Sequence, residues 1–209
     1  MDKALLVVGG EVPPRAALAH LVPSLRAVCA ADSGLEVVHE WGLEPTLIVG
    51  DMDSLTKPEL LFAYPRARIV RVDRAKDETD TELGLRLLCE TGRYDIILAG
   101  GGGGRLDHLL AVRALFERPL RPREWWTASE RVVLADGPFE AELPAGAIVS
   151  VFPLAPGARG MRSRGLRWPL DGLAWGPGDF GVSNEAMGGK VRVEPGIGEL
   201  LVVLPFPRG

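Results

Sequence analysis

Short apolar runs alternate with helical patterns along the first 120 residues of the chain. Runs rich in Leu, Ile, Val and Ala predict buried strands, and stretches with apolar residues every three or four positions predict helices between them. The expected strands cover residues 4–8, 27–31, 47–49, 69–72 and 96–99, and the expected helices cover residues 14–22, 35–41, 81–90 and 106–116. This alternation indicates a parallel sheet with helices on both faces, an α/β arrangement of the Rossmann-like, three-layer type.

Aspartates and glycines follow these strands at the ends where a parallel sheet binds ligands. Asp32, Asp51, Asp53 and Asp73 come after successive apolar runs, and five consecutive glycines at residues 100–104 follow the last run. Ligands of open α/β sheets bind outside the carboxyl ends of the strands. We therefore expect a functional site at this edge of the sheet.

The pattern changes near residues 119–122, where two prolines occur. Beyond them, short apolar runs separated by Gly and Pro replace the helical periodicity. The expected strands cover residues 131–135, 147–152, 190–193 and 199–204. Short strands with frequent turn residues are typical of an antiparallel sandwich or barrel. We predict two domains, an α/β domain over residues 1–120 and a small antiparallel β-sandwich domain over residues 121–209.

Composition argues against several classes of protein. Apolar residues make up 46% and charged residues 25% of the 209 residues, as in soluble globular proteins and unlike disordered ones. No apolar run approaches the roughly 18 residues of a membrane span, and no secretory signal is visible. We therefore expect a cytoplasmic protein without a membrane partner. Two cysteines, Cys29 and Cys89, and three scattered histidines do not suggest disulfides or a zinc site.

The net charge of −4 hides an uneven distribution of acidic residues. Nine of the twelve aspartates fall within residues 1–120. A net negative charge argues against nucleic-acid binding through a broad basic surface. Aspartates that gather without His or Cys favour a hard, oxygen-liking cation such as Mg²⁺.

The first candidate motif is Gly-Asp-Met-Asp-Ser at residues 50–54. Residues two apart on an extended segment point to the same side, so Asp51 and Asp53 would converge. Two converging carboxylates repel each other unless a cation or a proton lies between them. Mg²⁺ that bridges to substrate phosphates would be such a cation. The alternative is a turn with solvated carboxylates, and this motif alone does not decide between the two interpretations.

The second motif is Lys76-Asp77-Glu78-Thr79-Asp80, directly before a predicted helix. Asp77 or Thr79 could cap that helix, and acidic residues in its first turn would suit the helix dipole. A lysine beside a helix N-terminus and more carboxylates suits a phosphate and its metal. Taken alone, a run of charges is more often a solvated surface.

The third motif is the glycine run at residues 100–104, followed by Arg105, Asp107 and His108 at the start of a helix. Each glycine costs backbone entropy, and a tight strand-to-helix turn needs only one or two. A longer run permits close approach of the backbone to a ligand and exposes N–H groups to an anion, and Arg105 would add a bidentate phosphate contact. The spacing fits neither a P-loop nor a dinucleotide fingerprint. His108 is the one histidine that we consider a site candidate.

The β domain offers the segment Gly-Val-Ser-Asn-Glu at residues 181–185 and two tryptophans. Ser and Asn beside Gly favour a turn, which is our default prediction for this segment. Trp168 and Trp175 could form a flat wall for an aromatic ligand. A tryptophan in a small β domain is more often part of the core.

Taken in order, the motifs resemble those of the thiamine pyrophosphokinase (thiamine diphosphokinase) family. They are Ala-Asp-Ser-Gly at residues 31–34, the motifs at 50–54 and 76–82, Gly-Gly-Arg-Leu-Asp-His at 103–108, and Gly-Val-Ser-Asn-Glu at 181–185. Each motif alone is weak, but five in the order and spacing of the family, spread over nearly the whole chain, are specific. Met52 stands where the family often has Phe, and Ser33 stands where it commonly has Gly.

The resemblance implies an N-terminal α/β domain that binds ATP and Mg²⁺, a C-terminal β-sandwich that binds thiamine, and a homodimer with active sites near the subunit interface. The implied reaction converts ATP and thiamine to AMP and thiamine diphosphate. The carboxylates implied for catalysis and for the metal are Asp51, Asp53 and Asp80, with Asp32 close by. The implied ATP-side residues are Lys76, Asp77, Thr79, Arg105, Asp107 and His108, and the implied thiamine-side residues are Ser183 and Asn184.

Two alternatives stay open at this point. The chain could be a related pyrophosphokinase that acts on another heteroaromatic alcohol, such as a hydroxymethylpterin. It could also be a nucleotide- or thiamine-binding module without catalysis. The choice of general base also stays open, with Asp53 and Asp80 as the candidates.

Overall fold

The structure is a computed structural model that describes residues 2–73 and 77–206 of the chain. Lys76, one of the predicted ATP-side residues, lies outside the described residues. The chain divides into two compact units, the first ending at Ala128 and the second beginning at Ser129. Within the described ranges, no helix is both long enough and apolar enough to span a membrane.

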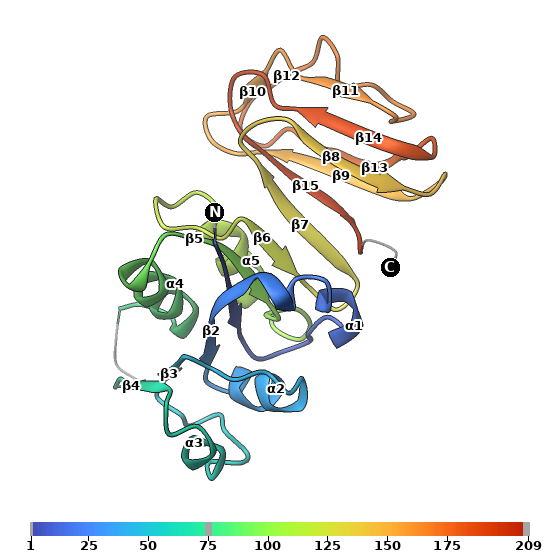
Figure 1. Cartoon of the computed structure of the whole chain (residues 1–209). Coiled ribbons are helices and arrows are strands. Elements are labelled where there is room, and N and C mark those ends of the chain that lie inside the picture. Colours follow the sequence, from blue (N-terminus) through green and yellow to red (C-terminus); the bar gives the residue numbers. More distant parts are fainter. Residues whose placement is uncertain (1, 74–76, 207–209) are drawn as a thin grey trace. The chain divides into compact units, whose positions relative to one another are not determined.

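The first unit is built on a parallel sheet of six strands, in the order β6-β5-β1-β2-β3-β4 (Figure 1). The strands are β1 (Asp2–Val7), β2 (Leu25–Ala31), β3 (Leu47–Gly50), β4 (Arg68–Arg71), β5 (Tyr94–Ala99) and β6 (Glu124–Trp126). β1 to β3 and β5 end in fully or nearly fully buried runs, which explains their continuous apolar sequences. The predicted α/β fold class is confirmed.

Helices connect the strands and cover the sheet. They are α1 (Arg15–Leu18), the 3₁₀ helix η1 (Val22–Ser24), α2 (Gly34–Glu40), α3 (Leu60–Ala63), α4 (Asp80–Thr91) and α5 (Leu106–Leu115). α2 connects β2 to β3, toward one edge of the sheet, and α4 connects β4 at that edge back to β5. Because both crossovers are right-handed, these two helices lie on opposite faces of the sheet (Figure 1). Leu83 and Leu88 of α4 and Leu35 and Val38 of α2 are buried against the sheet.

Two sequence predictions in this unit fail for local reasons. The helix expected over residues 14–22 is wrong in extent, because α1 covers four residues and a 3₁₀ turn follows it. Pro23 lacks the N–H that a continuing α-helix needs and disfavours helical geometry at the preceding residue. The strand β6 was not predicted, because its three residues are too few to give a periodic signal.

The second unit is a sandwich of two antiparallel sheets. One sheet has the order β13-β9-β15-β7 and the other has the order β11-β14-β8, with a two-stranded ribbon β10-β12 beside them. The strands are β7 (Glu130–Ala135), β8 (Phe139–Leu143), β9 (Ile148–Pro153), β10 (Ala158–Arg159), β11 (Arg162–Arg164), β12 (Ala174–Trp175), β13 (Gly181–Glu185), β14 (Gly189–Glu194) and β15 (Leu200–Pro205). The predicted antiparallel β-sandwich is confirmed.

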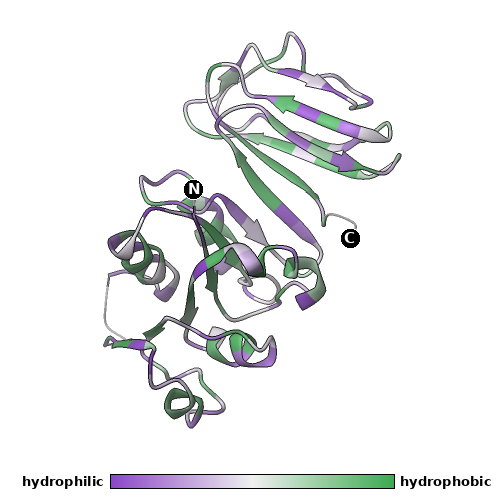
Figure 2. Ribbon diagram, viewed as in Figure 1, coloured by the Kyte–Doolittle hydropathy of each residue, from purple (hydrophilic) through white to green (hydrophobic). Residues whose placement is uncertain are grey.

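The core of the sandwich comes from alternate residues of facing strands. Val149 and Val151 of β9 and Val191 and Val193 of β14 are almost fully buried, while the residues between them are partly exposed. This period of two is the pattern of a sheet with one face on a core. Figure 2 shows the same alternation as green and purple bands along strands of the sandwich. The turn expected over residues 181–185 is wrong, since these residues form β13, an edge strand.

Candidate active site

The acidic residues at the carboxyl edge of the parallel sheet come from neighbouring strands. Asp32 follows β2, and Asp51 follows β3, which pairs with β2 in register. The N–H of Asp32 donates to the carbonyl of Val49, and the N–H of Met52 donates to Oδ1 of Asp32 (3.2 Å). The side chain of Asp32 therefore lies across the end of β3, beside the segment that carries Asp51.

Gly50 makes this arrangement possible. Its φ of +133° is a conformation that side chains rarely adopt, and a Cβ at this position would overlap the carboxyl group of Asp32. Asp32 and Met52 also have positive φ values, 46° and 66°. Strained backbone of this kind persists where the surrounding structure enforces it and is common at functional sites.

Asp80 joins the cluster from the start of α4. Its carboxyl group shares a hydrogen bond with that of Asp32. Burial, the contact with Asp80 and the charge of Asp51 raise the pKa of Asp32 to about 7, although the hydrogen bond from Met52 acts in the opposite direction. The structure thus brings three of the predicted carboxylates together, an arrangement that favours a proton or a cation between them.

The remaining acidic residue of the first motif lies on the exposed side of the same segment. Oδ1 of Asp51 accepts a hydrogen bond from the N–H of Asp53 (3.0 Å), and Asp53 itself is exposed. Among the described residues, no group of three or more His, Cys, Asp or Glu side chains forms a ready-made metal site. Mg²⁺ in phosphate-transfer sites is usually held by one or two carboxylates, with phosphate and water oxygens completing its shell. An all-oxygen donor set of this size fits that mode of binding.

Thr79 caps the helix that carries Asp80. Its hydroxyl accepts from the N–H of Glu82 (3.2 Å), and the Glu82 carboxylate accepts from the N–H of Thr79 (2.8 Å), which completes a capping box. Of the two capping residues expected, Thr79 takes this role. Asp77 is exposed two residues before it. The cap fixes where α4 begins and hence where the carboxylate of Asp80 lies.

The glycine run has a structural role that the sequence analysis missed. The N–H of Gly100 donates to Trp126 (3.0 Å), the N–H of Gly101 donates to Gly9 (2.8 Å), and the carbonyl of Gly102 accepts from the N–H of Glu11 (2.8 Å). The run therefore interlocks with the loop after β1. The N–H groups of Gly100 and Gly101 are therefore taken up by the protein itself, and the expectation of anion binding stays a prediction for the later glycines of the run. The signal available in the sequence was the Gly9-Gly10 pair after the adjacent strand.

Arg105, Asp107 and His108 form a separate local arrangement at the start of α5. The guanidinium of Arg105 binds the Asp107 carboxylate through two hydrogen bonds of 3.1 and 2.6 Å, and the N–H of His108 donates to the same carboxylate. This pairing lowers the pKa of Asp107 and raises that of Arg105. All three residues are exposed, so Arg105 stays accessible to an anion in solvent.

The second unit carries the two predicted residues Ser183 and Asn184 on β13. Ser183 is exposed with a φ of 59°, and its N–H donates to the hydroxyl of Ser150. Asn184 is 8% exposed and is the buried polar residue among the described residues. Its amide accepts from the N–H of Trp168 (3.1 Å) and donates to the carbonyl of Trp168 (2.6 Å). Asn184 therefore holds a neighbouring segment rather than pointing freely into solvent.

Trp168 is the residue that Asn184 fixes. Trp168 is 53% exposed, and the guanidinium of Arg167 lies 5.1 Å from the ring centre while also pairing with Glu185 (2.7 Å). An exposed indole with a fixed backbone offers a rigid aromatic face. Trp175, in contrast, packs against the sandwich core, as tryptophans in β domains usually do.

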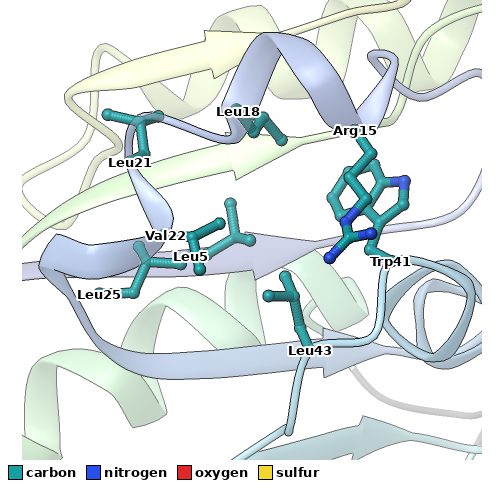
Figure 3. A pocket seen from close by; sticks show the side chains of 8 residues that line it. All are labelled: Leu5, Arg15, Leu18, Leu21, Val22, Leu25, Trp41 and Leu43. Atoms are coloured by element: carbon teal, nitrogen blue, oxygen red, sulfur yellow. The ribbon is translucent and has the colours of Figure 1, made fainter.

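A small apolar pocket in the first unit lies away from the acidic cluster (Figure 3). It is lined by Leu5, Arg15, Leu18, Leu21, Val22, Leu25, Trp41 and Leu43. Leu25 begins β2, whereas Asp32 follows its end, so the pocket belongs to the opposite end of that strand. Its lining offers one charged group and no carboxylate, which makes it a poor place for phosphate chemistry.

Comparisons with known proteins agree on one family. The sequence model described as "Thiamin pyrophosphokinase, catalytic domain" matches residues 18–124, just over half of the chain. This range contains all of the described acidic cluster. No curated protein sequence matches the chain.

Solved structures of the same family share the fold over almost the whole chain. A thiamine pyrophosphokinase from Bacillus subtilis has a TM-score of 0.81 at 20% identity, covering 97% of this chain and 99% of its own. One from Geobacillus thermodenitrificans has a TM-score of 0.78 at 25% identity, covering 97% of each chain. One from Candida albicans has a TM-score of 0.74 at 16% identity, covering 98% of this chain and 90% of its own. With its matching sequence model and its five ordered motifs, the chain belongs to the thiamin pyrophosphokinase family.

Proposed function

We propose that the chain transfers the pyrophosphate group of ATP to the hydroxyl of thiamine, giving thiamine diphosphate and AMP. The observation that carries this proposal is the meeting of Asp32, Asp51 and Asp80 at the carboxyl edge of the parallel sheet, in a chain of this family. Three clustered carboxylates disfavour full ionisation unless a cation joins them. ATP brings such a cation with it, as its magnesium complex.

In this proposal the thiamine hydroxyl attacks the β-phosphorus of ATP. A new O–P bond forms, the bond between the β-phosphorus and the oxygen retained by AMP breaks, and the hydroxyl proton passes to a carboxylate. Asp53 and Asp80 are the candidates for that base. Mg²⁺, when bound through Asp51, Asp53 and Asp80, would neutralise the phosphate charge that opposes the attack. Catalysis of this kind depends mainly on positioning and charge neutralisation.

The proposed ATP-side residues are Lys76, Asp77, Thr79, Arg105, Asp107 and His108. Arg105 supports this assignment best, because its exposed guanidinium can exchange the Asp107 carboxylate for a phosphate of the same bidentate geometry. Thr79 contributes through the position of Asp80. For the thiamine side we propose Ser183 directly and Asn184 through Trp168, whose exposed indole suits a heteroaromatic ring.

We further propose that the working enzyme is a cytoplasmic homodimer with active sites near the subunit interface. This part follows from family membership and is tested by measuring the mass of the purified chain in solution by light scattering. A monomer that is fully active would contradict it.

A product assay with Mg²⁺, ATP and thiamine tests the reaction. AMP and thiamine diphosphate should appear in equal amounts, whereas thiamine-dependent ADP would refute pyrophosphate transfer. Turnover with a hydroxymethylpterin in place of thiamine would favour a related pyrophosphokinase. Binding of ATP and thiamine without product would favour a binding module.

Two variants make the assay specific to the acidic cluster. Asp51→Asn should lower kcat by about 10²–10³-fold, as expected for loss of a group that stabilises charge in the transition state. Asp2→Asn is the matched control, because Asp2 is an exposed aspartate at the start of β1 that pairs loosely with Arg26 (3.7 Å). Equal activity of the two variants would remove Asp51 from the proposed machinery.

A further inference from the structure

Glu36, in the first turn of α2, binds the segment that carries Asp51 and Asp53. Its carboxylate accepts hydrogen bonds from the N–H of Thr56 (2.6 Å), from the hydroxyl of Thr56 (2.9 and 3.0 Å) and from the N–H of Lys57 (3.1 Å). Partial burial acts to raise the pKa of Glu36, but the hydrogen bonds from Thr56 and Lys57 outweigh it and hold that pKa below its usual range. The side chain is thus an ionised anchor under ordinary conditions.

The anchored segment has no regular secondary structure of its own. Residues 51–59 connect β3 to α3 without a helix or strand, and most of them are exposed. Ordering such a segment costs about 1–2 kcal/mol per residue in backbone entropy. Local contacts must offset that cost if Asp51 and Asp53 are to face one direction.

Three residues near the start of α2 supply those contacts, Asp32 and Glu36 through their carboxylates and Ser33 through its N–H. Asp32 accepts from Met52 and the hydroxyl of Ser54 accepts from the N–H of Ser33 (3.2 Å), while Glu36 holds Thr56 and Lys57. Asp53 therefore lies between the contacts at Met52 and Ser54, and Asp51 lies between the end of β3 and the contact at Met52. The contact at Glu36 is the strongest by chemistry, because its carboxylate accepts from three donors, two N–H groups and one hydroxyl.

A simpler role for Glu36 explains less. An acidic residue in the first turn of a helix interacts favourably with the helix dipole. That effect requires a carboxylate but no contact with Thr56 or Lys57. The same helix carries Glu40 at its other end, exposed and without these contacts, which provides a matched comparison.

We propose that Glu36 is a positioning residue for the cation and polyphosphate site, which it orders by fixing Thr56 and Lys57 downstream of Asp51 and Asp53. The inference rests on the proposed function insofar as these two aspartates handle a cation. It assigns Glu36 no contact with substrate. Loss of the anchor should loosen the acidic segment and weaken cation binding, while the thiamine side stays unaffected.

Binding of Mn²⁺ to the full chain, followed by electron paramagnetic resonance, tests this without turnover. Glu36→Ala should weaken Mn²⁺ binding by about 10-fold or more, within the range seen when outer-shell partners of metal ligands are lost. Glu36→Gln retains an acceptor oxygen and should show a smaller loss, and Glu40→Gln should bind within twofold of wild type. Exchange of the Thr56 and Lys57 amides should speed up in the two Glu36 variants only.

A second variant approaches the same contact from the other side. Thr56→Val keeps the shape and the N–H but removes the hydroxyl that donates to Glu36. Its effect on Mn²⁺ affinity should be non-additive with Glu36→Gln, because both changes break one interaction. This variant keeps the proposal testable if Glu36→Ala does not fold.

The outcomes separate this proposal from the proposed function. Wild-type Mn²⁺ affinity in Glu36→Ala, additive effects in the pair, or no Mn²⁺ binding by the wild-type chain would each overturn the positioning role. If the variants behave as expected but the wild-type chain makes no thiamine diphosphate, Glu36 positions a cation site and the proposed reaction is wrong. If the enzyme is active, kcat and the KM for magnesium–ATP should change in Glu36→Ala, and the KM for thiamine should not.

Discussion

The carboxyl groups of Asp32, after β2, and Asp80, at the start of α4, share a hydrogen bond although 48 residues separate them in the sequence. Two carboxyl groups can share a hydrogen bond only when one of them holds a proton. With its pKa raised to about 7, Asp32 keeps a proton below that pH, beside the place where the proposed cation would bind. Stability and cation binding should both depend on that proton.

Replacement of Asp32 by Asn should stabilise the chain at high pH. An ordinary Asp loses its proton near pH 4, whereas Asp32 in the folded chain keeps it to about pH 7. The folded state binds more protons than the unfolded state between these values, so stability falls as the pH rises from about 4 to 7. Asn avoids this loss and keeps an acceptor for Met52. Because solvent screens a half-buried group, we expect the free energy of unfolding of Asp32→Asn to exceed that of wild type by only about 1 kcal/mol, or 2–4 °C in Tm.

Thermal unfolding of Asp32→Asn and wild type at pH 5 and pH 8, without divalent cations, checks this. The difference in Tm should be near zero at pH 5 and positive at pH 8. A variant that is less stable at pH 8 would show that the Asp32 carboxylate stabilises the fold instead of straining it.

Replacement of Thr79 by Ala should lower stability more than it lowers chemistry. The hydroxyl of Thr79 caps α4, and loss of such a cap costs about 1 kcal/mol. Tm should fall by about 2–4 °C, while kcat under saturating substrates should stay within a few-fold of wild type. Asp80→Asn should do the opposite, with a loss of kcat of at least 100-fold. Calorimetry measures Tm and the product assay measures kcat for both variants. A large loss of kcat in folded Thr79→Ala would show that the Thr79 hydroxyl contacts substrate.

Replacement of Asn184 by Ala should destabilise the sandwich. The change removes the side-chain partner of the N–H and carbonyl of Trp168 in a partly buried setting, which costs about 1–2 kcal/mol of folding free energy. If Trp168 contacts thiamine, the KM for thiamine should rise and the KM for ATP should not. Ser183→Ala is the comparison, because Ser183 is exposed and should leave Tm unchanged. Equal Tm values for the two variants would contradict the role described for Asn184.

Alanine substitutions within the glycine run should lower the free energy of unfolding by very different amounts. A Cβ on Gly100 (φ +99°) would overlap the carbonyl of Val8 and come within 3.2 Å of that of Gly9, so backbone must move. We expect a loss of about 2–5 kcal/mol from strain and overpacking. Gly104 (φ +64°) has no atom within 4 Å of such a Cβ and should lose only about 1 kcal/mol. Denaturant titration measures both, and similar values would argue against the interlock with the loop after β1.

The sequence predicted the parts of the site that follow from strand ends. Asp32 and Asp51 lie together because parallel neighbours β2 and β3 end at the same edge, and this follows from alternation alone. The contact of Asp80 with Asp32 depends on how α4 crosses the sheet. No local pattern around Asp80 carries that information.

The parts that sequence reasoning missed depend on partners far along the chain. Asn184 was expected in a turn, because its neighbours Gly181 and Ser183 are turn formers, but its side chain bonds to Trp168, sixteen residues earlier. Glu36 was not singled out, because a Glu in the first turn of a helix has an ordinary local explanation. Its partner Thr56 lies twenty residues away, across the end of β3.

The strand order of the first unit also bears on how the chain is made. β1 is the first strand to be synthesised, yet it lies between β2 and β5 and pairs with residues 94–99. At about 5–20 residues per second, the ribosome needs about 5–20 seconds to deliver that neighbour. During this time the edge of β1 that β5 will cover has no partner strand, and the Gly9–Glu11 loop lacks its hydrogen bonds to the glycine run. The sheet can therefore close around β1, and the Gly9–Glu11 loop can take its final place, only after residue 102 has been synthesised, so a nascent chain that ends before β5 should leave both unformed.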